Sequence, residues 1–217
     1  AVVVSPPGRD RCFWACPGAN RTFGSADIDY DLLPDAGVFH FGYPPLLPRM
    51  LARDGAEMRR VCERARARGL ATSLDMCTPE PGIIDWAPWL ENVLPTVDLF
   101  LPSLPELMTL LPLGDAASSA DPSPPDFRLL QEYGDRLLGL GCALVMIKLG
   151  ARGLYLRTAP LDRISGIRNA IPRFRADEWA DRELYVPAYR VVVRSANGAG
   201  DCAAAGFISG LLRGEGP

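Results

Sequence analysis

The residues best placed to do chemistry lie near the end of the chain, from Ser195 to Phe207, which reads Ser-Ala-Asn-Gly-Ala-Gly-Asp-Cys-Ala-Ala-Ala-Gly-Phe. Small residues lead into an expected helix, where unpaired backbone N–H groups and the helix dipole favour a bound anion. Gly198 and Gly200 let the backbone approach a ligand closely, and Asp201 is placed to take a proton from an attacking hydroxyl. The same residues are also typical of a tight turn with Asp201 as helix cap, and both interpretations stay open here.

Three further polar residues belong to expected strand ends and helix starts. Asp75 and Lys148 each end a strand, and Glu106 lies three residues after Ser103, which begins a helix. A carboxylate at the end of a central strand is costly to bury, which favours a functional role for Asp75. Lys148 either extends to a surface or reaches a phosphate. Glu106 is either the capping-box partner of Ser103 or a functional acid.

The scarcity of two residue types excludes several kinds of site. The 217 residues include one lysine, Lys148, and one histidine, His40, against 22 arginines. A site built from several histidines is impossible, and a Walker phosphate loop is excluded because leucine and glycine follow Lys148. A Ser-His-Asp triad could use only His40, which we expect to pack in an apolar strand. A net charge of −3 without long blocks of like charge argues against a nucleic-acid partner.

Cysteine usage and hydropathy predict a cytoplasmic protein. The six cysteines include no Cys-x-x-Cys pair, and a chain with 48% apolar residues can bury a core without disulfides. No apolar run approaches the ~18 residues of a membrane span, and no cleavable leader is visible, so no membrane partner is expected. The chain starts in strand-like sequence without Met and stops directly after an expected helix, so both ends are expected to be cut.

Apolar strands alternate with amphipathic helices along most of the chain. We expect strands at 2–4, 12–15, 38–41, 70–75, 97–101, 143–147 and 191–193, and helices at 27–33, 86–94, 127–140 and 201–213. Asp54 and Glu57 have capping-box spacing at a further helix start, and the region from Arg157 to Leu184 is expected to be irregular. This alternation predicts a mostly parallel sheet covered by helices on both faces, an α/β three-layer sandwich. Ligands then bind beyond the carboxyl ends of the strands, where the polar residues described above all fall.

The segment around Asp201 resembles the signature of the PfkB (ribokinase-like) carbohydrate kinase family, Asp-Thr-x-Gly-Ala-Gly-Asp followed by small residues and Ala-Gly-Phe. Weaker matches follow the family's order along nearly the whole chain: a lid turn at 7–11, Gly-Ala-Asn at 18–20, a strand end at 73–75, an Asn-x-x-Glu motif at 103–106 and a strand-turn-strand at 148–153. The resemblance implies a ribokinase-like fold in which residues 1–20 form a partial small β lid and residues 21–217 the nucleotide- and substrate-binding core.

The resemblance also implies a reaction, the transfer of a phosphoryl group from ATP to a hydroxyl of a sugar or related small molecule. It makes Asp201 the general base, and the amides of Gly198, Ala199 and Gly200 stabilise charge on the transferring group. It assigns the nucleotide to Lys148, Gly150 and Asn197, the acceptor to Asp75, Asn20 and Arg11, and Mg²⁺, through water, to Glu106.

Departures from the family pattern limit these assignments. Ser103 replaces the Asn of Asn-x-x-Glu, and Ser195 stands where the family often has an Asp that helps to bind a monovalent cation, so that cation is in doubt. The family's amino-terminal Gly-Gly region and the carboxyl-terminal segment of its adenine pocket have no counterpart here. The alternative is therefore a catalytically inert fragment or a nucleotide- or sugar-phosphate-binding protein of the same fold. A homodimer through the lid is an option that the resemblance leaves open.

Overall fold

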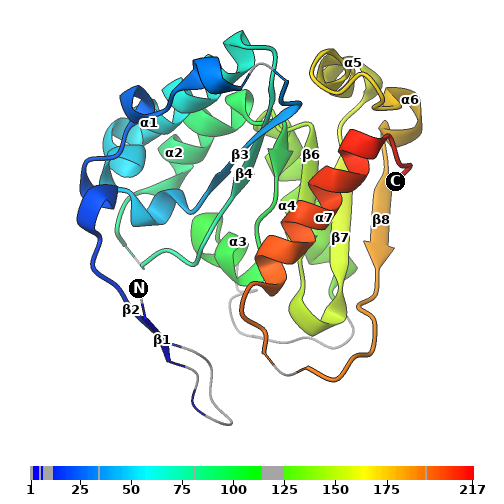
Figure 1. Ribbon diagram of the computed structural model, residues 1–217. Helices are drawn as coiled ribbons and strands as arrows, with labels where there is room; N and C mark the ends of the chain where they lie inside the picture. The colour runs from blue at the N-terminus through cyan, green and yellow to red at the C-terminus, as the bar shows by residue number, and fades with distance from the viewer. Residues whose placement is uncertain are drawn as a thin grey trace.

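One mixed sheet of six strands lies at the centre of the structure (Figure 1). The computed structural model describes residues 2–4, 6, 12–33, 35–80, 82–113, 125–193 and 195–217. In spatial order the strands are β3 (Val38–Gly42), β4 (Ala71–Asp75), β5 (Leu99–Phe100), β6 (Leu144–Lys148), β7 (Leu154–Thr158) and β8 (Glu183–Val186). Strands β3 to β6 run parallel to one another, and β7 is antiparallel to both β6 and β8. The sheet is mostly parallel, as predicted.

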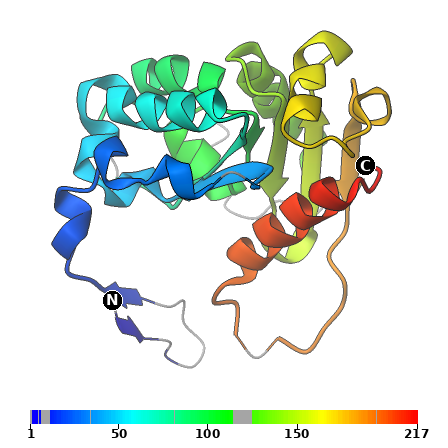
Figure 2. The ribbon, with the colours of Figure 1, turned by 45° about the horizontal axis from the view of Figure 1, so that its top comes forward.

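Helices cover both faces of this sheet (Figures 1 and 2). One face packs against α1 (Pro48–Ala67), α2 (Trp86–Val93), α3 (Leu104–Leu110) and α4 (Phe127–Gly139). The other packs against α7 (Ala199–Arg213), with the short helices α5 (Leu161–Ile164) and α6 (Ala176–Trp179) completing a second core. The 3-10 turns are Gly18–Arg21, Ser25–Asp27, Tyr30–Leu32, Pro44–Leu46, Leu94–Thr96, Gly150–Arg152 and Ser165–Asn169. The predicted three-layer α/β sandwich is confirmed.

The structure also gives the state of the cysteines and the lengths of the helices. All six cysteines have free thiols, with Cys62 and Cys142 buried in the core. Across the described parts of the chain, no helix is both long enough and apolar enough to cross a membrane.

A separate two-stranded sheet is formed by the amino-terminal residues, where β1 (Val2–Val4) pairs antiparallel with β2 (Cys12–Trp14). Both strands are predicted from the sequence, whereas the expected lid turn at 7–11 lies outside the described residues. The pair stands off the six-stranded sheet in both views (Figures 1 and 2), and Phe13 and Trp14 are exposed. The division of the chain into a lid of residues 1–20 and a core of residues 21–217 stays a prediction.

The carboxyl ends of the parallel strands meet at one edge of the sheet, the lower edge in Figure 1, on the same side as the amino-terminal hairpin. The strand register places Gly42 beside Asp75 and Ser103 beside Lys148. The start of α7 joins this edge, because a Cβ at Gly200 would lie 3.6 Å from Nζ of Lys148. Strands β4 and β6 end in Asp75 and Lys148, so this edge of the sheet carries charged side chains beside the start of α7.

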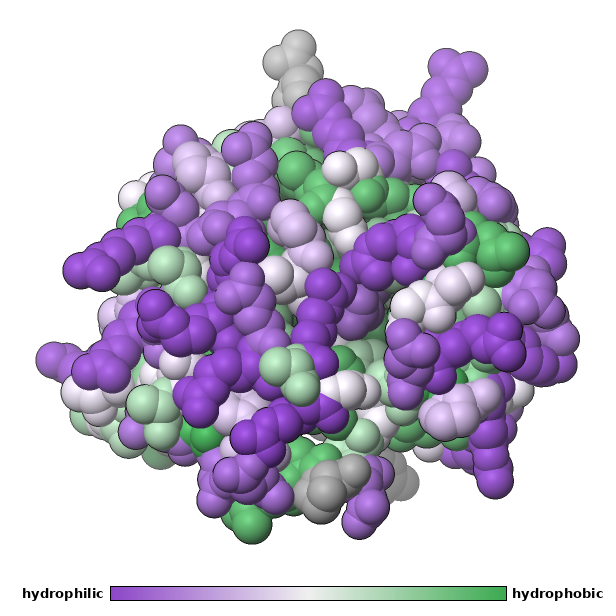
Figure 3. Space-filling model, turned by 90° about the horizontal axis from the view of Figure 1, so that it is seen from above, coloured by the Kyte–Doolittle hydropathy of each residue, from purple (hydrophilic) through white to green (hydrophobic). Residues whose placement is uncertain are grey.

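The opposite edge is closed by an ionic network around Asp98, the residue before β5. Asp98 accepts hydrogen bonds from Arg66 of α1 at 2.5 Å and from Arg163 of α5 at 3.2 Å. It also accepts the backbone N–H of Thr72 at 2.8 Å. Seen from this end, hydrophilic side chains cover most of the surface (Figure 3). The network joins layers of the sandwich at the end of the sheet away from Asp75.

Three segments differ from their predicted structure. Region 157–184, expected to be irregular, holds the end of β7, helices α5 and α6 and the start of β8, elements too short to show a clear period. The helix expected at 27–33 is instead the turns Ser25–Asp27 and Tyr30–Leu32. The strand expected at 191–193 is absent from this described stretch, and its three valines are 71%, 91% and 70% exposed. Valine favours a strand only where a neighbouring strand and a packed face are available.

Helix α1 contains a break where the sequence predicts a capping box. Arg53, Asp54 and Gly55 have positive φ angles of 52°, 52° and 74°, so the chain leaves the helical conformation and re-enters it after Gly55. Glu57 accepts the backbone N–H of Ser25 at 2.7 Å. The sequence spacing predicts a helix start near the right position but with the wrong cap.

Replacing Gly55 by alanine is expected to destabilise the fold. A Cβ at this position would lie 2.5 Å from Cγ2 of Val93 and 2.7 Å from Nε1 of Trp89, on a backbone with left-handed φ. Backbone strain and overpacking together should lower the free energy of unfolding by about 2–4 kcal/mol, measured by urea unfolding. Gly139→Ala is the control, because open space surrounds that position. An equal urea midpoint for Gly55→Ala and the unchanged protein would contradict the tight packing of α1 on α2.

Candidate active site

The glycine-rich segment forms a turn into α7. Gly198 caps this helix with a φ of 78°, a left-handed conformation that glycine adopts without strain. The N–H of Cys202 makes a helical hydrogen bond of 2.9 Å to the carbonyl of Gly198, so the N–H groups before it have no carbonyl one helical turn earlier. The N–H of Ala199 instead closes the turn onto the carbonyl of Ala196 at 3.2 Å. The start of this 15-residue helix has the backbone groups and dipole of an anion site.

A buried ion pair between Lys148 and Asp75 lies beside this helix start. Nζ of Lys148 is 2.5 Å from Oδ1 of Asp75, and the two side chains are 11% and 2% exposed. The same oxygen accepts the N–H of Met76 at 2.7 Å. Burial raises the pKa of Asp75, and the charge of Lys148 opposes that rise. Because Gly200 is also next to Nζ, the ammonium group lies between a buried carboxylate and the anion site.

Glu106 is held by the capping box that its spacing from Ser103 predicts. The N–H of Ser103 donates to Oε2 of Glu106 at 2.6 Å, and the N–H of Glu106 donates to Oγ of Ser103 at 3.4 Å. Burial raises the pKa of Glu106, while the Ser103 N–H and the charge of Lys148 oppose the rise.

The donor set can be compared with the needs of Mg²⁺. Within the described ranges, no group of three or more His, Cys, Asp or Glu side chains could hold a metal ion. Mg²⁺ in phosphate-transfer sites uses one or two carboxylates together with water and substrate phosphates. A single carboxylate such as Glu106 fits that requirement through water.

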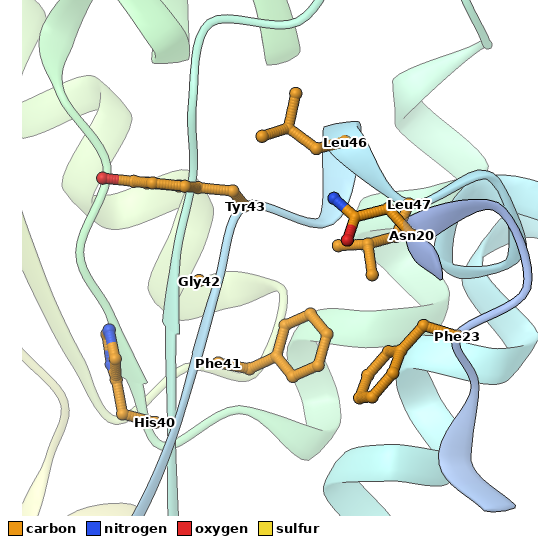
Figure 4. A pocket seen from close by; sticks show the side chains of 8 residues that line it. All are labelled: Asn20, Phe23, His40, Phe41, Gly42, Tyr43, Leu46 and Leu47. Atoms are coloured by element: carbon orange, nitrogen blue, oxygen red, sulfur yellow. The ribbon is translucent and has the colours of Figure 1, made fainter. Parts of the chain in front are cut away.

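Two side chains from β3 and its end reach the same edge. The hydroxyl of Tyr43 donates to Oδ1 of Asp201 at 2.6 Å, and Nδ1 of His40 lies 2.9 Å from Oγ of Ser73. Figure 4 shows Tyr43 and His40 on one side of β3. Partial burial lowers the pKa of His40, whereas burial and the hydrogen bond to Asp201 raise the pKa of Tyr43. Both shifts favour the neutral form of the side chain, the imidazole of His40 and the phenol of Tyr43.

An open cavity of about 330 Å³ adjoins these side chains (Figure 4). It is lined by Asn20, Phe23, His40, Phe41, Gly42, Tyr43, Leu46 and Leu47. Phe23, Phe41 and Leu47 lie on the opposite side of β3 from His40 (Figure 4). His40 lies in a strand as expected, but its side chain is exposed and lines a cavity, which corrects the expectation that it is packed. Asn20, predicted to bind the acceptor, lies on the wall of the same cavity.

Two other predicted residues, Gly150 and Asn197, stand outside this cluster of contacts. Gly150 lies in the turn between β6 and β7, and Asn197 lies in the turn before α7; both are exposed. The N–H of Asn197 donates to Oγ of Ser195 at 3.2 Å. Arg11 lies outside the described residues. The ligand-binding roles of all three stay predictions.

Tyr43 is the residue of this site that sequence reasoning missed. It follows Gly42 and adopts a φ of 65° and a ψ of 52°, a left-handed conformation that is uncommon for a non-glycine residue. The only local signal is the Gly-Tyr-Pro-Pro sequence, which predicts a turn after a strand. A turn signal does not reveal which distant side chain the tyrosine contacts.

The fold is ribokinase-like. A ribokinase from Thermotoga maritima superposes with a TM-score of 0.62 at 17% identity, over 98% of this chain and 56% of that one. A ribokinase from Arabidopsis thaliana, solved in complex with ribose and ATP, gives a TM-score of 0.61 at 18% identity, over 98% and 56% of the two chains. The chain therefore spans about half the length of these solved proteins.

The sequence places the chain within a family of that fold. The family model described as pfkB family carbohydrate kinase matches residues 1–217. An uncharacterized sugar kinase from Archaeoglobus fulgidus is 24% identical over 217 residues, which are 99% of this chain and 68% of the relative. The chain belongs to the pfkB family of carbohydrate kinases.

Proposed function

We propose that the protein transfers the γ-phosphoryl group of ATP to a hydroxyl of a sugar or related small molecule. The observation that carries this proposal is the position of Asp201, a carboxylate in the first turn of α7 next to the Gly198–Gly200 backbone. A proton acceptor and an anion site then share one helix start. Membership of a carbohydrate kinase family supports the same reaction.

Each side chain then has a part in the transfer. The carboxylate of Asp201 takes the proton of the acceptor hydroxyl while the oxygen of that hydroxyl forms a bond to the γ-phosphorus. The bond from that phosphorus to the leaving oxygen of ADP breaks, and backbone N–H groups at the start of α7 donate to the phosphoryl oxygens. Lys148 supplies positive charge beside Gly200, where negative charge accumulates.

The other residues at the carboxyl edge of the sheet are assigned to the metal ion, the acceptor and the nucleotide. Glu106 would hold Mg²⁺ through water, and the ion supplies charge neutralisation to the ATP phosphates. Asn20 lines the open cavity at Tyr43, which suits it for contact with the acceptor. The family resemblance assigns Asp75 to the acceptor, but its side chain is 2% exposed and paired with Lys148, so its proposed role is chiefly to hold Lys148. Gly150, Asn197 and Arg11 are assigned to the nucleotide and acceptor by family resemblance.

A screen of acceptors tests this proposal. The complete protein encoded by the gene is incubated with ATP, Mg²⁺ and a panel of sugars, sugar acids and nucleosides, and ADP release is measured. We expect release to depend on at least one acceptor and to saturate with its concentration. ATP binding without acceptor-dependent release across the panel would favour the non-enzymatic alternative.

A further inference from the structure

The contact between Tyr43 and Asp201 joins two segments that are 158 positions apart in the chain. Tyr43 lies just beyond β3, and its N–H donates to the carbonyl of Asp75 at 3.2 Å. Pro44 and Pro45 follow it and begin a 3-10 turn, which restricts the backbone further. The backbone of Tyr43 is therefore restrained by the hydrogen bond to Asp75 and by the two prolines that follow it.

The left-handed backbone of Tyr43 is a strained arrangement for a tyrosine. Residues held at positive φ cost about 1–3 kcal/mol, and such strain concentrates at functional sites. Here the strained residue directs its side chain along the His40 side of β3, away from Leu46 and Leu47 (Figure 4). On that side lies Asp201.

The two carboxylate oxygens of Asp201 have different surroundings. Oδ1 accepts the Tyr43 hydroxyl at 2.6 Å. Oδ2 faces the glycine turn, 3.9 Å from the position that a Cβ would take at Gly198. Asp201 is exposed, and an exposed aspartate rotates freely about its side-chain bonds unless a contact restrains it.

We propose that Tyr43 is a positioning residue that holds Oδ1 of Asp201 so that Oδ2 is presented to the acceptor hydroxyl at the anion site. This inference rests on the proposed function of Asp201 as the base. Burial and the adjacent carboxylate keep the proton on the phenol, so Tyr43 remains a donor over the working pH range of an enzyme. The proton taken from the acceptor goes to Oδ2, and the phenol is unchanged at the end of the cycle.

The test compares Tyr43→Phe with the unchanged complete protein, using the best acceptor from the screen. Phenylalanine keeps the ring and the backbone conformation and removes only the donor. We expect kcat to fall about tenfold, since small misplacements of a catalytic group have effects of this size or larger, while the KM values for ATP and acceptor change less than about twofold. Tyr189→Phe is the matched control, because Tyr189 is 91% exposed.

A double variant separates a positioning role from a general structural one. Tyr43→Phe should lower kcat in the unchanged protein and have no further effect in the Asp201→Asn background, because its action passes through that carboxylate. An equal loss in both backgrounds would contradict the inference. So would a gain in activity with a lower acceptor KM, which would mean that the phenol occupies the place of the acceptor hydroxyl.

One readout does not depend on activity. In a crystal structure of Tyr43→Phe, we expect the Asp201 carboxylate to occupy more than one rotamer. A single rotamer identical to that of the unchanged protein would overturn the inference even if no acceptor is found. Absence of ATP-dependent transfer in the unchanged protein would overturn the proposed function instead.

Discussion

Asp201→Asn is expected to lower kcat by about 10²–10⁴-fold, the usual contribution of a general base. Asparagine has the shape of aspartate and its side-chain oxygen still accepts the Tyr43 hydroxyl, but its amide does not take a proton from an acceptor. The backbone at the start of α7 is unchanged, so ATP should bind within about threefold of its original affinity. The loss therefore falls on the chemical step.

Steady-state kinetics of the complete protein, together with ATP titration by calorimetry, measure both quantities. Asp177→Asn is a suitable control, because Asp177 also lies in the first turn of a helix and is exposed. Turnover of Asp201→Asn equal to that of the unchanged protein would remove Asp201 from the role of base. A matching loss of ATP affinity would show that the variant perturbs the anion site rather than proton transfer.

Lys148→Met is expected to reduce both stability and activity. It leaves Asp75 without a partner at 2% exposure, and breaking a buried ion pair from one side costs about 3–5 kcal/mol. It also removes the positive charge beside Gly200, which should lower kcat/KM for ATP by about 10²-fold. The two effects have separate causes and respond differently to a second substitution.

The double variant Asp75→Asn, Lys148→Met separates them. Removing both charges leaves no buried ion, so urea unfolding should regain most of the lost free energy, whereas kcat/KM for ATP should stay low. If the double variant regains both stability and activity, Lys148 is only the structural partner of Asp75.

The stability loss of Lys148→Met should also depend on pH. Burial raises the pKa of Asp75, and loss of Lys148 removes a charge that opposes this rise. A carboxyl whose pKa is higher in the folded than in the unfolded state destabilises the fold increasingly as pH rises above the unfolded value. The penalty should therefore be smaller at about pH 5 than at about pH 8. A penalty that grows toward acid pH would contradict this cause.

Strands with continuous apolar runs and one helix start are the parts of the fold that the sequence predicts well. The first four residues of β6, Leu144 to Ile147, are apolar and buried, as expected for a strand buried on both faces. The small residues ahead of Asp201 predict the start of α7 within two residues. The apolar run and the small residues are both local features of the sequence, so they can be recognised without knowing which elements pack against them.

Short elements and strand partners are not predictable in the same way. Strand β7 is as long as β6 but contains Arg157, and the four residues of β8 include Glu183. Neither strand therefore forms an apolar run that is distinct from the surrounding loops. The valines 191–193 have strong strand propensity, yet they are exposed. Propensity predicts a strand only when the tertiary structure supplies a neighbour.

The sequence predicts which residues of the candidate site lie at the same edge of the sheet, but not which of them contact one another. Parallel strands bring Asp75 and Lys148 to one edge, which the alternation of elements predicts. Their direct ion pair, across 73 positions, depends on side-chain geometry. The role of Tyr43 is not predictable from the sequence, because tyrosine has no preference for the left-handed backbone conformation that it adopts here.

The most direct measurement follows the γ-phosphoryl group itself. The complete protein and its Asp201→Asn variant are incubated with ATP labelled in that group, Mg²⁺ and the acceptor panel, and the acceptors are separated and counted for label. The proposed function predicts label on a hydroxyl of at least one sugar-like acceptor with the unchanged protein, and a loss of about 10²-fold or more with the variant. Label that remains in ATP or appears only as inorganic phosphate, with every acceptor, would contradict it.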